Sequence, residues 1–317
     1  MTLDSTQRLG PFPTGMDNRL PDYKLDTAED GAVLRDAFNV DITDAGSIKT
    51  RPGYALALSG GDCHSLWAPL DGRFALFCDD GSLYRFDPPA GKTLVAPGFG
   101  ATTPVRYTEV NEAIYFTDGL RVGSYGNTTT PAWTAGAAQD VGDQHLMAMP
   151  AGQQIAHHGA RLLVAVGAAL IYSEPFTPHL RDPAKGFEIF PAPITLLAAV
   201  EGGVFVVADK TYWIAGGFPA QSVQAVSPDT APQQQAGHDR DGGAHWLSSS
   251  GIVAASPAGE LRNLQAGRIA MSVAGAAATL YREADGMQTI VAAMGGENNT
   301  AAGVGSYAQA RIVRKEP

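Results

Sequence analysis

The feature that most constrains the fold of this chain is a unit that recurs about every forty residues. Each copy has an apolar segment, a tight turn and a second segment that often carries Tyr or Trp. The copies occupy residues 73–87, 112–126, 161–175, 203–217 and 243–257, and a weaker sixth occupies 286–294. Their starts lie 39, 49, 42, 40 and 43 residues apart. This spacing is typical of the blades of a β-propeller, which are four-stranded sheets.

The repeats therefore predict an all-β fold, and more specifically a β-propeller. One small sheet cannot bury both of its apolar faces alone, whereas several sheets packed radially can. Six blades fit the spacing best, and five or seven stay open. A β-sandwich or β-solenoid with accidental spacing is the main alternative, and an α/β fold is less favoured. Composition agrees with short strands, because 37 glycines and 21 prolines punctuate the chain.

Another hairpin is predicted at residues 36–55, ahead of the first copy. Apolar and polar residues alternate on either side of Gly46, which can adopt a left-handed turn conformation. An isolated hairpin is marginally stable in water, and the sixth copy lacks a clear second strand. We therefore expect this hairpin to pair with residues 286–294 and close the ring. The residues assigned to this closure are Asn39, Asp41, Gly46, Arg51, Gly53 and Tyr54.

Residues 1–35 are predicted to form an extended arm beside a propeller domain of residues 36–317. The arm is broken by prolines and weakly periodic, so it can bury little of its own apolar surface. Ordering a backbone costs about 1–2 kcal/mol per residue. We therefore expect another chain to order the arm. The residues expected to dock on that partner are Phe12, Met16, Asn18, Arg19, Leu20 and Tyr23.

Charge and hydropathy bear on the binding partners. The formal charge is −10, with 22 basic and 32 acidic residues and no block of like charges. This disfavours sequence-specific nucleic-acid binding and attachment to anionic membranes. No apolar run is long enough for a membrane helix, and the first residues do not resemble a signal peptide. We expect synthesis in the cytoplasm and no membrane insertion.

No metal site or cofactor is predicted. The densest group of potential ligands is His238, Asp239, Asp241 and His245. Imidazole and carboxylate both suit divalent transition metals, but the spacing matches no strong motif and fits an acidic loop between blades. The motifs of serine hydrolases, zinc proteases and phosphate loops are missing from the sequence. We therefore expect no enzymatic activity.

Two pairs of residues carry further expectations. His157 and His158 are adjacent on a predicted strand and should face opposite sides, one buried and one solvated. Cys63 and Cys78 lie on neighbouring predicted strands and are expected to be unpaired, because such cysteines are usually small buried hydrophobes.

The N-terminal segment carries a recognisable pattern. Residues 17–19 read DNR, and residues 37–54 read AFNVDITDAGSIKTRPGY. This combination resembles the opening of β-propeller tail proteins of tailed bacteriophages, of the nozzle or tail-tip type. The matching positions are Asn18, Arg19, Ala37, Asn39, Val40, Asp41, Ile42, Gly46, Ile48, Arg51, Gly53 and Tyr54.

The resemblance implies a structural role in the virion tail, without catalysis. It implies a homo-oligomeric ring of six or three chains that contacts other tail proteins. The main alternative is a receptor-binding propeller that recognises a host-surface glycan or protein through its loops, where Tyr125, Trp133 and Phe176 are candidate stacking rings. A propeller enzyme such as a lactonase or glycosidase is a third possibility.

Overall fold

The computed structural model describes residues 11–12, 15–25, 31–35, 40–43, 45–50, 56–59, 61, 63–126, 138–142, 144–268, 275–284, 287–294 and 306–311. Within them one short 3-10 helix, η1 (Asp22–Lys24), accompanies 27 strands. Every strand ladder is antiparallel, apart from isolated bridges. The all-β prediction is confirmed.

Four sheets have four strands each, added in chain order. They are β3 (His64–Trp67), β4 (Ala75–Asp79), β5 (Ser82–Asp87) and β6 (Gly91–Pro97); β12 (Gln154–His158), β13 (Arg161–Val166), β14 (Ala169–Tyr172) and β16 (Phe187–Ile189); β17 (Leu196–Val200), β18 (Gly203–Val207), β19 (Thr211–Ala215) and β20 (Val223–Ser227); and β21 (Gly237–His238), β22 (Ala244–Ser248), β23 (Gly251–Ala255) and β24 (Leu261–Asn263).

The remaining sheets are smaller. Three have three strands: β7 (Arg106–Val110), β8 (Ala113–Thr117) and β9 (Val122–Gly126); β25 (Ala277–Ala284), β26 (Met287–Met294) and β27 (Ser306–Arg311); and β10 (Ala138–Val141), β11 (Gln144–Ala148) and β15 (Leu180–Arg181). A two-stranded sheet contains β1 (Val40–Ile42) and β2 (Ile48–Thr50).

The hairpins form where the sequence repeats predict them. In the first, Asp80 and Gly81 adopt φ values of 48° and 68° between β4 and β5. Two successive positive φ values give a turn whose twist matches that of the paired strands. In three of the sheets the second strand is buried along its whole length, since all residues of β8, β18 and β22 are buried. These continuous apolar runs follow from burial on both faces.

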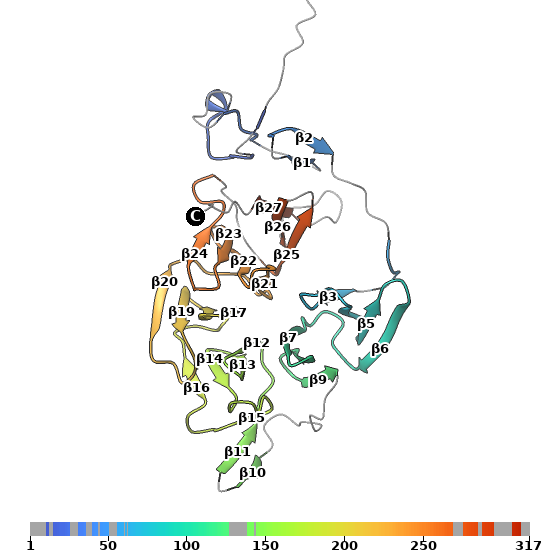
Figure 1. Cartoon of the computed structure of the whole chain (residues 1–317), viewed down its shortest axis with the longest axis vertical. Coiled ribbons are helices and arrows are strands. Elements are labelled where there is room, and N and C mark those ends of the chain that lie inside the picture. The colour runs from blue at the N-terminus through green and yellow to red at the C-terminus, as the bar shows by residue number, and fades with distance from the viewer. Residues whose placement is uncertain are drawn as a thin grey trace, which may run out of the picture.

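Successive sheets pack face to face through apolar clusters. Five such clusters join the β3–β6 sheet to β7–β9, then to β12–β16, β17–β20, β21–β24 and β25–β27 in turn. In Figure 1 these six sheets follow one another around a common centre, with β3, β7, β12 and β17 on the side nearest that centre. The contacts that β12 makes with β7 and with β17 agree with this view. The arrangement is propeller-like.

Two hydrogen bonds from one side chain connect distant parts of the chain near the centre. The Gln235 side chain accepts a hydrogen bond from the Tyr107 N–H (3.1 Å) and donates one to the Tyr107 carbonyl (2.7 Å). It thereby joins β7 to the segment that precedes β21, 128 residues further along the chain. The Gln235 amide thus pairs with the N–H and the C=O of Tyr107, as the backbone of a neighbouring strand would.

The pairing predicted for the N-terminal hairpin is wrong. The hairpin itself forms, with Val40 opposite Thr50 and Gly46 at φ 74°. However, β26 lies between β25 and β27, so both of its edges are occupied. The outer strand of this sheet comes from residues 306–311. Among the described residues, β1 and β2 pair only with each other.

The sheet β10–β11–β15 has no counterpart in the sequence prediction. Its strands β10 and β11 lie between the second and third repeats and account for their longer spacing of 49 residues, whereas β15 follows the third repeat. The β10–β11 hairpin projects away from the other sheets at the bottom of Figure 1.

Candidate functional site

The described part of the arm folds back on itself and is not extended. Asp17 donates its N–H to the Leu34 carbonyl (2.8 Å), and Leu34 donates to Gly15 (3.0 Å). Phe12 is buried at 7% exposure, and its N–H donates to the Gly46 carbonyl (2.7 Å). The prediction of an extended arm is wrong for these residues, because they find backbone partners and burial within the chain.

The other predicted docking residues differ in accessibility. Met16, Asn18 and Leu20 are half-buried, whereas Arg19 is exposed and Tyr23 is 77% exposed. The Asn18 N–H donates to the Arg268 carbonyl (3.1 Å), which links the arm to the loop after β24. Tyr23 is therefore the large apolar side chain of this set with most surface available for a partner.

The hairpin is held to the last sheet by an ion pair. The Asp41 carboxylate lies 3.5 Å from the Arg282 guanidinium on β25. All three residues of β2 are exposed, including Ile48 at 48%. The other predicted closure residues, Asn39, Arg51, Gly53 and Tyr54, lie outside the described residues.

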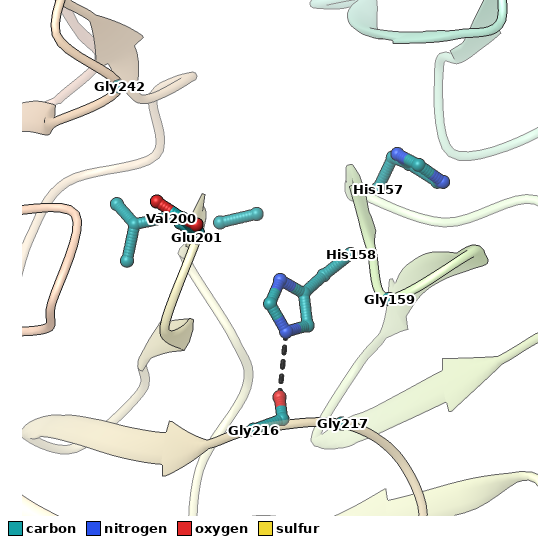
Figure 2. A pocket seen from close by; sticks show the side chains of 9 residues that line it. His157, His158, Gly159, Val200, Glu201, Gly216, Gly217 and Gly242 are labelled. Carbon is teal, nitrogen blue, oxygen red and sulfur yellow. Dashed lines mark hydrogen bonds between the residues drawn. The ribbon is translucent and has the colours of Figure 1, made fainter.

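A concave site lies among the turns of neighbouring sheets. It has a volume of about 560 Å³, and turns from three neighbouring sheets meet there. Its lining residues are His157, His158, Gly159, Ala199, Val200, Glu201, Gly216, Gly217 and Gly242. We refer to it as the turn hollow (Figure 2).

The two histidines of the turn hollow have different surroundings. The His158 Nε2 atom lies 2.7 Å from the Gly216 carbonyl oxygen, so Nε2–H donates to it and Nδ1 is left as an acceptor. The two side chains leave β12 in different directions (Figure 2), as strand geometry predicts. Both are half-buried, so the expectation of one buried and one solvated imidazole is wrong. Burial, and then the neighbouring His158, lower the pKa of His157.

The potential metal ligands at residues 238–245 do not converge on one point. Asp239 caps its own loop, since one carboxylate oxygen accepts from the N–H groups of Asp241 (2.9 Å) and Gly243 (2.8 Å). His238 Nε2 lies 3.0 Å from the Ala199 carbonyl oxygen. Across the described ranges, no group of three His, Cys, Asp or Glu side chains could hold a metal ion.

Several buried side chains have atoms that lack a hydrogen-bond partner, among them His245 and Arg106. His245 is 1% exposed, and neither ring nitrogen has a hydrogen-bond partner; burial, and secondarily His238, lower its pKa to about 3. Arg106 is 8% exposed, its Nε is unpartnered, and burial lowers its pKa to about 10. Such groups weaken a fold rather than stabilise it.

The three predicted stacking rings fall in different settings. Tyr125 is half-buried, and its hydroxyl accepts from Arg85 (3.3 Å). Phe176 is 86% exposed on the loop after β14. Trp133 lies outside the described residues.

No family model and no curated protein matches this chain. Solved structures match weakly in shape. A gluconolactonase from Xanthomonas campestris has 9% identity and a TM-score of 0.45, over 77% of this chain and 84% of that one. The CNH domain of AfRom2 has 9% identity and a TM-score of 0.45, over 85% and 84%. The extracellular domain of a two-component system from B. thetaiotaomicron has 9% identity and a TM-score of 0.45. The match covers 70% of this chain and 30% of the length of that protein.

Among the described residues, no helix is long and apolar enough to cross a membrane.

Proposed function

We propose that this chain is a structural, non-enzymatic component of a bacteriophage tail that acts through protein–protein assembly. The proposal starts from the resemblance of residues 17–54 to phage tail propellers. The observation that carries it is the N-terminal module, which we define as residues 11–50. It lies outside the main sheets (Figure 1) and presents an open strand edge and Tyr23.

The physical argument concerns the small sheet of this module. A two-stranded hairpin is marginally stable alone, and among the described residues no third strand joins β2. An exposed strand edge is a template for pairing with another chain. A neighbouring subunit or another tail protein can complete the sheet, and Ile48 then becomes buried.

We further propose that the chain forms a six-bladed propeller, with the N-terminal module spanning the join between first and last blades. Six of the sheets are of blade type, and five apolar clusters fill the spaces between successive ones. Between β25–β27 and β3–β6 the described residues supply no such cluster. The Asp41–Arg282 pair ties the module to the last blade, and the chain then continues into the first.

The assembled form is proposed to be a homo-oligomeric ring of three or six chains in the virion tail, built in the host cytoplasm. Its partners are further copies of itself and other tail proteins. Nucleic-acid recognition has no part in the proposal.

A double substitution in the module tests the assembly role. The variant Tyr23→Ser with Ile48→Ser should keep the melting temperature within about 2 °C, since both side chains are exposed and exposed sites change stability by about 0.5 kcal/mol or less. Its incorporation into tails should fall at least about tenfold in a complementation assay. Leu120→Ser, an 84% exposed site on the β8–β9 turn, is the matched control. Normal incorporation of the double variant would contradict the proposed docking surface.

A receptor-binding role is the second candidate, and it is favoured by the turn hollow. A concave site with a few polar groups suits recognition of a small molecule or a surface sugar. In a tail-tip protein this role and the structural one are compatible.

A further inference from the structure

Phe176 lies on a loop whose backbone is hydrogen-bonded to the β12–β13 turn, part of which lines the turn hollow. Phe176 has φ 59°, a region that non-glycine residues rarely adopt, and its side chain is 86% exposed. Its N–H donates to the Ala160 carbonyl (2.9 Å). Ala160 directly follows Gly159, which lines the hollow. Gly159 and Ala160 both have positive φ. A strained backbone conformation at a residue with an exposed, large apolar side chain indicates a binding role, because the side chain does not contribute to packing within the chain.

Two polar side chains of the hollow offer hydrogen-bond acceptors. Glu201 is exposed and carries a carboxylate, and His158 keeps Nδ1 as an acceptor because Nε2–H is used by Gly216. No Lys or Arg lines the site. Such a lining suits a ligand rich in hydroxyl donors and disfavours an anionic one.

The lining glycines leave the site open. A Cβ added to Gly216 or Gly217 would meet no atom within 4 Å, and one added to Gly159 would only reach Gly217 at 4.0 Å. A flat ligand can therefore approach the main chain on this side. The volume of about 560 Å³ lies within the range of small-molecule sites, roughly 300–1,000 Å³.

We propose that the turn hollow binds a neutral saccharide, with the Phe176 ring as its stacking platform. Sugar rings stack on flat aromatic faces through their C–H groups, while their hydroxyls donate to carboxylate and imidazole acceptors. Glu201 and His158 would accept those hydroxyl hydrogen bonds. The inference rests on the receptor-binding candidate and gives it a site and a ligand class.

The test is binding of the full-length protein to an array of neutral and sialylated bacterial and animal oligosaccharides, followed by titration of the best ligand. Phe176→Asn removes the ring and keeps a residue that tolerates positive φ. Gly217→Phe adds a ring at a lining position that has no positive φ and an open Cβ. Thr93→Phe adds the same ring at an exposed site on β6 and is the matched control.

We expect a neutral oligosaccharide to bind, with its dissociation constant raised about tenfold or more in Phe176→Asn and Gly217→Phe and unchanged in Thr93→Phe. Absence of neutral glycan binding, preference for sialylated ligands, or unaltered affinity in Gly217→Phe would overturn the assignment. Arginine methyl ester is included as a cationic probe, and its competition for the site would show that Glu201 selects a cation instead. Incorporation of Gly217→Phe into tails, measured in parallel, separates failure of this site from failure of the assembly role.

Discussion

Replacing Trp246 with alanine is expected to lower the free energy of unfolding by about 3–5 kcal/mol. The indole is fully buried on β22, where its ring centroid lies 5.5 Å from that of Phe205 on β18. It fills the interface between two sheets, so its loss leaves a cavity that rigid strands on both sides cannot close. Urea unfolding followed by far-UV circular dichroism measures the change.

Trp246→Phe is the matched comparison. It keeps an aromatic ring in the interface and removes the indole N–H, which has no hydrogen-bond partner. We expect a loss below about 1.5 kcal/mol, because the volume change is smaller and an unpaired donor disappears. If both variants lost the same small amount, the interface between the β17–β20 and β21–β24 sheets would not be packed as described.

Acidification is expected to destabilise the protein through His245. Its folded pKa of about 3 lies below the unfolded value of about 6.5, so the unfolded chain takes up a proton first as pH falls. Stability is therefore fully present above about pH 6.5 and declines down to about pH 3. Between pH 7.5 and pH 5 the expected loss from this residue is about 2 kcal/mol.

His245→Phe isolates that contribution, because phenylalanine fills the buried site without titrating. Burial also lowers the pKa of His157 and His179, so the variant should retain part of the acid sensitivity. The difference between wild type and variant, measured by urea unfolding at the two pH values, should be about 2 kcal/mol. Equal pH dependence in the two proteins would mean that His245 is not buried in the neutral form.

Local features of the fold could be predicted from the sequence. Asp80-Gly81 specifies a tight turn, and the apolar runs around it specify paired strands, so each hairpin is encoded within about fifteen residues. The strand β15, with two residues, and the strand β10, Ala138–Val141, carry no comparable apolar signal. They are formed by pairing with β11, which periodicity does not report.

Pairing between strands far apart in the chain could not be predicted from the sequence. The sequence could not show that residues 306–311 would pair with β26 in preference to the N-terminal hairpin, because both alternate weakly and chain order does not decide between them. The turn hollow was missed for a similar reason. His158, Glu201 and Gly217 come from three turns, and only the arrangement of the sheets brings them together.

The central claim, a structural role in a phage tail, is tested most directly by quantitative mass spectrometry of purified virions from a phage or prophage that carries this gene. The account predicts that the chain is present in a copy number of three or six per tail, and that it co-purifies with tails after the heads are removed. Its absence from mature particles, together with a purely monomeric protein in the infected cell, would contradict the account.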